Sequence, residues 1–310
     1  MKIFLIGKSG SITHWLEAAA GAFRREGHDV RVGVVRRPWL NAGIEGALAD
    51  PLAGMMATSI ARFSPDLILA IGAFHVPLPF LERIASLPGR PALAGWVGDL
   101  FDGTAETVAS RYDLVAYTDS GLLARHASLG FGTRAIFLPH AASLDAAPAA
   151  AVRAPRLVFV ANATPGRKAV IDGLGAPIAV YGPGWSVEPG SSHDIHGRVP
   201  HRAVAGLYAR HLAALNIRNE RNVLHGLNQR SFDPYLSATP VVTDDQADLE
   251  RCFDPGTEVL VWRDAEGLNA IHDRLLRFPE DAARIGEAGR RRVLAEHRFS
   301  HRLASLRAAL

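Results

Sequence analysis

The chain has 310 residues, of which 48% are hydrophobic and 21% charged, and its formal net charge at pH 7 is +3. This composition is typical of a soluble globular protein with a substantial core, and the length suits two domains of about 150 residues each. The net charge is too small to indicate nucleic acid binding, and the single cysteine, Cys252, excludes an internal disulfide.

Two features of the sequence bear on where the protein resides. The start "MKIFLIGKSG" has too short an apolar run for the core of a signal peptide. The longest apolar zone, "LILAIGAFHVPLPFL", contains two prolines and a histidine and is too short to span a bilayer. We therefore expect a cytoplasmic protein, in which Cys252 is a small core residue rather than a reactive thiol.

The first half of the chain alternates short apolar runs with helix patterns. The expected strands, in chain order, are "KIFLIG", "DVRVGVV", "PDLILAIGA", "ALAGWVGD", "DLVAYTD" and "RAIFLPH". The expected helices between them are "SITHWLEAAAGAFRREG", "DPLAGMMATSIARF", "PLPFLERIAS", "TAETVASRY" and "SGLLARHASLG". The strands are continuous apolar runs, which is typical of a parallel sheet covered by helices on both faces.

A second alternating region follows an Ala- and Pro-rich linker, which we place at 143–155. Its expected strands are "RLVFVAN", "PIAVYG", "LAALNI", "PVVTDD" and "EVLVW". Its expected helices are "GRKAVIDGL", "HRAVAGLYARH", "SFDPYLSA", "ADLERCF", "AEGLNAIHDRLLRF" and a long C-terminal helix. The sequence thus predicts an α/β protein of two doubly wound Rossmann-like domains facing a cleft, 1–142 and 156–310, with the last helix able to pack back on the first domain.

Polar residues that follow the strands are the candidate site residues, because ligands bind beyond the carboxyl ends of parallel strands. After the first strand, "GKSGSITHW" permits a tight turn and a helix N-terminus that an anion could meet, although the glycine spacing equally fits a structural turn. Asp99 follows "ALAGWV", where an acid could orient or deprotonate an acceptor hydroxyl or simply cap a helix.

The second half offers two further positions of this kind. Arg167 and Lys168 lie at a turn entering a helix, where they could clamp a diphosphate or form a solvated basic turn. In "HGLNQRSFDPYLSATPVV", Pro234 belongs in a first helical turn, which places the helix start near Arg230 or Ser231. The preceding backbone can then present N–H groups to an anion, and the charge of Asp233 suits the helix dipole.

Residues 155–302, roughly, resemble glycosyltransferases of the GT-B fold, and most closely the CgeB-like (spore maturation protein) group. The blocks that carry the resemblance are "RLVFVANATPGRKAVIDGL", "IAVYGPGW", "IHGRVPHRAVAGLYARHLAALNI", "GLNQRSFDPYLSATPVVTDD", "CFDPGTEVLVWRDAEGL" and "AGRRRVLAEHRFSHRL". The resemblance implies a hexosyltransferase of the retaining type that uses a nucleotide-sugar donor, usually UDP-linked, without a metal or another cofactor. It also implies that the N-terminal domain binds the acceptor, which would be a cell-surface glycan, a protein or another acceptor. This domain, with "WVGDLFD" and "YDLVAYTDS", matches the family more loosely.

The resemblance assigns roles residue by residue. The donor-side positions are Arg167, Lys168, Gly182, Gly197, Arg198, Val199, Gly226, Leu227, Asn228, Arg230 and Asp233. Arg167 takes the diphosphate position, residues 197–199 meet the base through their backbone, residues 226–230 face the phosphates and sugar, and Asp233 binds the ribose hydroxyls. The acceptor-side candidates are Gly10, His14 and His75, and the catalytic candidates are Asp99, Arg167 and His225.

The chain departs from the family pattern at one pair of positions. Related retaining enzymes often carry two glutamates eight residues apart, and here these positions are His225 and Asp233. Two alternatives therefore stay open: a sugar-nucleotide epimerase on the same fold, and a non-catalytic module that binds a nucleotide sugar or a partner. The Arg-rich C-terminal helix is either a solvated face of a packed helix or a peripheral contact with an anionic membrane surface.

Overall fold

The computed structural model describes residues 1–8, 13–36, 42–144, 146–150, 152–186, 192–219 and 222–310. The chain forms two compact units. Unit 1 comprises Met1–Pro139, Arg221–His225 and Phe299–Leu310, and unit 2 comprises His140–Glu220 and Gly226–Arg298.

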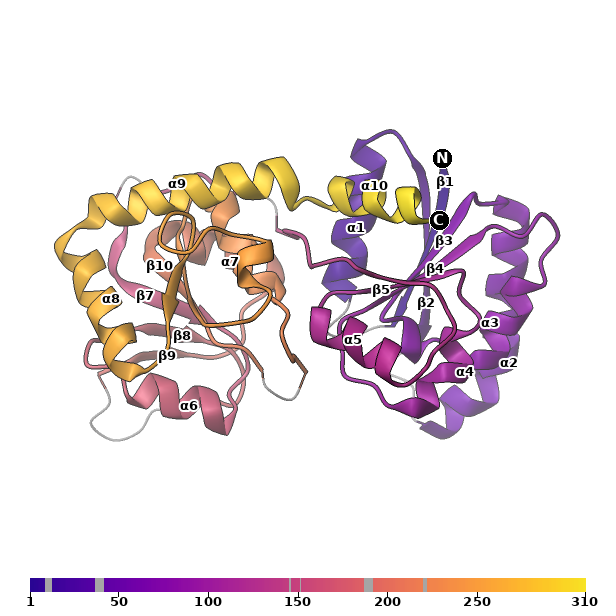
Figure 1. Ribbon diagram of the computed structural model, residues 1–310, viewed down its shortest axis with the longest axis horizontal. Helices are drawn as coiled ribbons and strands as arrows, with labels where there is room; N and C mark the ends of the chain where they lie inside the picture. The colour runs from indigo at the N-terminus through magenta and orange to yellow at the C-terminus, as the bar shows by residue number, and fades with distance from the viewer. Residues whose placement is uncertain (9–12, 37–41, 145, 151, 187–191, 220–221) are drawn as a thin grey trace. The chain divides into compact units, whose positions relative to one another are not determined.

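The centre of unit 1 is a six-stranded parallel sheet (Figure 1). Its strands are β1 (Lys2–Lys8), β2 (Asp29–Arg36), β3 (Leu67–Ile71), β4 (Ala92–Val97), β5 (Leu114–Tyr117) and β6 (Ala135–Phe137). They lie in the order β2-β1-β3-β4-β5-β6. The order reverses between β1 and β3, so the topological switch point of unit 1 is beyond the ends of these two strands.

Helices cover both faces of this sheet because successive strand residues point to opposite sides. The helices are α1 (Thr13–Arg25), α2 (Ala42–Phe63), α3 (Leu78–Ala85), α4 (Glu106–Ala109), α5 (Ser120–Ser128) and α10 (Phe299–Ala309), with 3₁₀ turns η1 (Ala73–His75) and η2 (Gly103–Ala105). On one face the Trp96 ring lies 4.7 Å from that of Trp15 and 6.1 Å from that of Phe299. The C-terminal helix α10 therefore packs beside α1 and completes the core of unit 1 (Figure 1).

Unit 2 is built around a second six-stranded parallel sheet. Its strands are β7 (Ala154–Val160), β8 (Ala179–Tyr181), β9 (Asp194–His196), β10 (His211–Asn216), β11 (Val241–Asp244) and β12 (Leu260–Trp262). Their order, β12-β11-β10-β7-β8-β9, is the Rossmann order when β7 is taken as the first strand. The switch point of unit 2 lies between β7 and β10.

The helices of unit 2 also form two layers. They are α6 (Pro165–Asp172), α7 (His201–Arg210), α8 (Ala265–Arg277) and α9 (Pro279–Glu296), with 3₁₀ turns η3 (Gln229–Ser231), η4 (Asp233–Ser237) and η5 (Leu249–Arg251). Leu157 and Phe159 of β7 share a cluster with residues of α6 and α8, whereas Val158 shares one with residues of α7 and η4. This alternation explains why the strands are apolar at every position.

Helix α9 packs unusually closely on η4. A Cβ atom at Gly289 would lie 2.1 Å from the Tyr235 ring, and one at Gly286 would lie 2.2 Å from the Ala238 carbonyl oxygen. Only glycine permits this approach, so these two positions fix the segment that follows the loop at 226–230.

The predicted fold class is confirmed, and the differences are local. Strand β9 was not predicted, because its three residues include Asp194 and His196 and form no apolar run. The helix predicted over "SFDPYLSA" forms two 3₁₀ turns instead, which end where Ala238 adopts a left-handed φ of 50°. Of the predicted linker, Ser143 and Leu144 are hydrogen-bonded parts of unit 2, and β7 already begins at Ala154.

Candidate functional site

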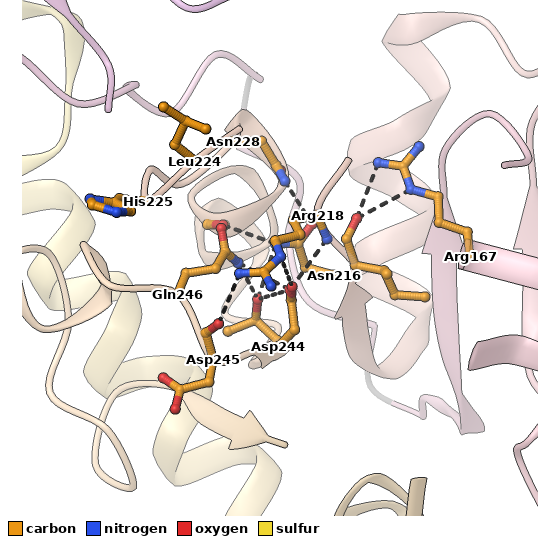
Figure 2. A network of polar contacts seen from close by, with 12 residues as sticks. Arg167, Asn216, Arg218, Leu224, His225, Asn228, Asp244, Asp245 and Gln246 are labelled. Carbon is orange, nitrogen blue, oxygen red and sulfur yellow. Dashed lines mark hydrogen bonds and ion pairs between the residues drawn. The ribbon is translucent and has the colours of Figure 1, made fainter. Parts of the chain in front are cut away.

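The candidate site is the switch point of unit 2, where β7 and β10 end (Figure 2). After β7 the chain turns into α6, whose N-cap Thr164 accepts a hydrogen bond from the Arg167 N–H at 3.3 Å. After β10 the chain continues from Asn216 through Ile217 and Arg218. The first turn of α6 and the end of β10 therefore bring charged and amide side chains to one edge of the sheet.

Arg167 is the buried arginine of this edge, with only 4% of its surface exposed. Its Nε and Nη2 donate to the Ile217 carbonyl oxygen at 3.2 and 3.1 Å, and its Nη1 donates to that of Asn162 at 3.1 Å. Burial, and after it the charge of Arg230, lower the pKa of Arg167 to about 10. The guanidinium stays protonated at neutral pH, and its two terminal nitrogens carry further N–H groups for an anion.

Asn216, the last residue of β10, is fully buried and joins the surrounding segments. Its Nδ2 donates to the hydroxyls of Ser231 and Thr243, each at 3.1 Å. Its Oδ1 accepts from Asn228 Nδ2 at 3.1 Å and from Arg230 Nε at 3.3 Å. Strand β11 and the loop at 228–231 are thus held against the end of β10 through one side chain.

Arg230 is the second cation of the site. Asn228 caps its turn by accepting from the Arg230 N–H at 2.9 Å. Burial lowers the pKa of Arg230, whereas the nearby Asp233 and Asp244 carboxylates raise it. Arg167 and Arg230 repel each other, so their proximity favours a bound anion.

Asp244, a carboxylate that acts on both of these cations, already has partners. It accepts from the Arg218 N–H at 3.2 Å and from Gln246 Nε2 at 3.1 Å, and it forms an ion pair with Arg218 Nε at 3.3 Å. Burial raises its pKa, and Arg218 opposes that rise. Because Arg218 balances Asp244, Arg167 and Arg230 together carry one positive charge more than Asp233, the other carboxylate that acts on Arg230.

Asp233, the predicted ribose ligand, is buried and tied to the segment that precedes β7. Its Oδ1 accepts from the backbone N–H groups of Ser143 and Leu144 at 2.6 and 3.2 Å, and Oδ2 accepts from the Ser143 hydroxyl at 3.0 Å. Burial raises its pKa to about 6, against the effect of these bonds and of Arg230. The geometry favours a structural role, and the ribose role stays a prediction.

The other donor-side candidates differ in how closely neighbouring atoms pack around them. Gly182 has a φ of 145°, and a Cβ there would lie 2.0 Å from the Ala161 carbonyl oxygen, so the backbone itself requires glycine. Gly197 has no described atom within 4 Å of its Cβ position, and Arg198 beside it is exposed. Val199 packs partly into the core, and Lys168 donates to the Ser186 hydroxyl at 3.3 Å.

Within the predicted loop 226–230, the residues have different surroundings. Leu227 is 2% exposed and belongs to the hydrophobic core, so only its backbone is left for a ligand. Gly226 is buried, and Asn228 joins the Asn216 network. The side chains of this loop that can meet an anion are therefore Asn228 and Arg230.

His225, predicted to lie near the donor sugar, belongs to unit 1. The Asp119 carboxylate caps α5 through Oδ1, and its Oδ2 accepts from the N–H groups of Leu224 and His225 at 2.8 and 3.0 Å. The His225 ring lies 3.3 Å from the Ser120 hydroxyl through Nδ1. No observation tests its predicted part in catalysis.

The acceptor-side candidates also lie in unit 1. His75 follows β3 and Asp99 follows β4, and Nε2 of His75 lies 3.4 Å from Oδ2 of Asp99. Asn222 Nδ2 donates to Oδ1 of Asp99, also at 3.4 Å. His14 lies in the first turn of α1, and Gly10 lies outside the described residues.

The sequence prediction missed the residues that connect the site. Asn216 was included in the apolar run "LAALNI", and Arg218, Asp244 and Gln246 were given no role. An amide at the last position of an otherwise apolar strand was the available signal, because a buried polar side chain requires partners.

The Arg-rich C-terminal segment forms many ion pairs within the protein. Arg284 pairs with Asp281 at 3.0 Å, and Arg292 pairs with Glu296 at 2.8 Å. Arg302 is buried and donates to the Pro139 carbonyl oxygen at 2.7 Å. These contacts favour a packed helix with a solvated face. None of the helices in the described part of the chain has the length and apolar character required to cross a bilayer.

One protein-family model matches the segment of the chain that contains these residues. Residues 162–308, just under half of the chain, match the model of the family described as glycosyl transferase-like. Among curated proteins, no relative matches the sequence.

Solved structures match over the whole chain. Sucrose-phosphate synthase from Thermosynechococcus elongatus is 14% identical with a TM-score of 0.70, covering 99% of this chain and 97% of its own. Anabaena HepE in complex with UDP and glucose is 14% identical with a TM-score of 0.70, covering 100% of both chains. The chain has the GT-B fold. T4 phage BGT in complex with its UDP-glucose substrate is 11% identical with a TM-score of 0.66, covering 100% of this chain and 99% of its own.

Proposed function

We propose that the protein is a glycosyltransferase that binds a UDP-linked sugar at the switch point of unit 2 and transfers the sugar to an acceptor. One observation carries the proposal: Arg167 and Arg230 come together at the carboxyl ends of β7 and β10 with an excess of positive charge. These residues fall in the segment that matches the glycosyl transferase-like family. The structures of HepE and T4 phage BGT, which contain UDP-glucose or its parts, support the donor class.

The arrangement suits departure of a nucleoside diphosphate. Negative charge grows on the diphosphate as the glycosidic bond breaks, so fixed cations stabilise the transition state more than the bound donor. Arg167 is fixed by the carbonyl groups of Ile217 and Asn162, and Arg230 by Asn216. Little reorganisation is then needed when the charge develops.

Two guanidinium groups also supply the charge that a divalent cation provides in other sites. We therefore propose that the donor site works without a metal. Among the described residues, no three His, Cys, Asp or Glu side chains converge in a way that could hold an ion. UDP binding is expected to survive excess EDTA, and loss on chelation with rescue by Mg²⁺ or Mn²⁺ would contradict this part of the proposal.

We extend the proposal to the family group, the transferred sugar and the stereochemistry of transfer. The order of sequence blocks supports the CgeB-like group, a hexose as the transferred sugar and retention of configuration. Retention needs no general base in the protein, whereas inversion would need one, and Asp99 is the residue proposed for that role. Product configuration, measured by nuclear magnetic resonance of the transferred sugar, separates the two mechanisms.

The first experiment measures melting temperature with UDP, GDP and dTDP, each with and without its sugar, followed by UDP release from UDP-glucose. A rise in melting temperature with UDP and UDP-glucose, but not with uridine alone, is expected because the diphosphate supplies the anion. An altered sugar nucleotide released without acceptor would instead identify an epimerase. Absence of binding by every nucleotide would reject the donor site.

A further inference from the structure

Asn216 uses its whole hydrogen-bonding capacity inside the candidate site. An asparagine side chain has two N–H donors and an oxygen that accepts two bonds, and all four positions are occupied here. The side chain is fully buried, so each partner is held away from water. Its side chain therefore fixes the loop at 228–231 relative to strands β10 and β11.

The orientation of the amide follows from its neighbours. Arg230 Nε can only donate, so the atom that faces it must be Oδ1 of Asn216. The amide of Asn228 is fixed in the same way, because its Oδ1 accepts from the Arg230 N–H and its Nδ2 must therefore face Asn216. Both amides thus hold Arg230, one at its backbone and one at its guanidinium.

The neutrality of Asn216 matters as much as its shape. A carboxylate at this position would also accept from Arg230 and Asn228, but it would neutralise Arg230 and lack donors for the Ser231 and Thr243 hydroxyls. Asp244 already lies at the end of the adjacent strand and is balanced by Arg218. An added negative charge at 216 would remove the excess positive charge that an anion needs.

We infer that Asn216 is a positioning residue of the donor site, which aims Arg230 at the diphosphate without adding a negative charge beside it. The inference rests on the proposed donor site and adds to it a residue that touches neither donor nor acceptor. It predicts that substitutions at 216 act through Arg230 and on the diphosphate part of the ligand.

The experiment is calorimetric titration with pyrophosphate, UDP and uridine in the presence of EDTA. Asn216→Asp is expected to weaken pyrophosphate and UDP binding by about tenfold or more, with uridine affinity unchanged. Asn216→Ala keeps the charge balance but loses all four hydrogen bonds, including the one that orients Arg230, so a smaller loss of about fivefold is expected. Asn269→Asp in α8 is the matched control, since it adds the same charge to unit 2 at an amide bonded to the backbone of Gly173 and Gly175.

A double-mutant cycle shows whether Asn216 acts through Arg230. Asn216→Ala is expected to lose most of its effect on pyrophosphate affinity in an Arg230→Ala background. An equal effect in both backgrounds would overturn the inference, as would wild-type pyrophosphate affinity in a folded Asn216→Asp protein. No pyrophosphate binding by the wild type would overturn it as well. If pyrophosphate binds as expected but UDP-glucose is neither bound nor consumed, the inference stands and the proposed function fails.

Discussion

The polar groups that follow the strands of the two units differ in construction. In unit 2, Asn216 is fully buried with four hydrogen bonds between 3.1 and 3.3 Å, and Arg167 is 4% exposed. In unit 1, His75 and Asp99 lie 3.4 Å apart, with side chains 38% and 42% exposed. An exposed pair of this kind is weakly coupled, whereas a buried network is preorganised.

Under the proposed function, this difference suits the two halves of a transfer reaction. Every donor with the same nucleoside diphosphate carries the same charge on its leaving group, so a rigid set of cations can stabilise the departure of that group. Groups that meet an acceptor need less rigidity before the acceptor binds. We therefore expect changes to Arg167 to affect turnover and folding together, and changes to the His75–Asp99 pair to affect transfer alone.

Arg167→Ala tests the rigid site and carries the largest expected effect. Turnover of UDP-glucose is expected to fall by about 10²–10³, because a preorganised charge is lost from the transition state. The melting temperature is expected to fall too, since the carbonyl groups of Ile217 and Asn162 lose their donor. Arg291→Ala, at an exposed position of α9, is the control. Near-wild-type turnover would place Arg167 in a purely structural role.

Asp99→Asn tests the exposed pair of unit 1. If Asp99 orients or deprotonates the acceptor hydroxyl, transfer is expected to fall by about 10², the lower end of the range for a group that takes a proton in the transition state. UDP affinity and the free energy of unfolding are expected to stay close to wild-type values, because the pair is exposed. Steady-state kinetics with acceptor varied, beside calorimetric titration with UDP, measures both. Weakened UDP binding would contradict the separation of the two sites.

Asp233→Ala separates the structural role from the ribose role. Loss of the carboxylate leaves the N–H groups of Ser143 and Leu144 without a partner, so the free energy of unfolding is expected to fall by about 1–3 kcal/mol. UDP affinity of the folded variant is expected to be unchanged. A ten- to hundredfold weaker UDP affinity would instead support the predicted ribose contact.

The same carboxyl group predicts a pH dependence. Its pKa in the folded protein, about 6, lies above the ordinary aspartate value of 3.8, so folding is favoured when the group is protonated. Its contribution to stability is complete below about pH 4 and is lost as the pH rises through 6, by roughly 2–3 kcal/mol. The nearby charged and titratable groups are Arg230 and Tyr208. The difference in unfolding free energy between wild type and Asp233→Asn should change over this range, and a constant difference would contradict the raised pKa.

Gly197→Ala has the smallest expected effect. A methyl group at Gly197 meets no described atom, so stability is expected to stay within about 0.5 kcal/mol of wild type. If a nucleotide base lies against this backbone, the methyl group crowds it and weakens UDP binding by about 1 kcal/mol. Gly182→Ala is the contrasting variant, because its Cβ would overlap the Ala161 carbonyl oxygen and is expected to destabilise unit 2. Equal UDP affinity in Gly197→Ala and wild type would remove residues 197–199 from the base site.

The sequence was sufficient for the architecture because continuous apolar strands and intervening helix patterns determine a parallel sheet. It was less informative where short polar segments form structure, as in β9, or where proline and a left-handed residue convert a helix to 3₁₀ turns, as in η4. Arg167 could be predicted from its place between strand and helix. The amide near the end of "LAALNI" marked Asn216 as a buried polar residue, but its four partners on β11 and on the loop at 228–231 could not be predicted from the sequence.

The central claim is that the diphosphate of a UDP-sugar binds between the carboxyl ends of β7 and β10. A crystal structure at saturating UDP, grown with EDTA, tests it most directly. We expect diphosphate oxygens within hydrogen-bond distance of the guanidinium groups of Arg167 and Arg230, with the hydrogen bonds of Asn216 unchanged. A diphosphate bound elsewhere, with these two arginines making no contact to it, would contradict the account.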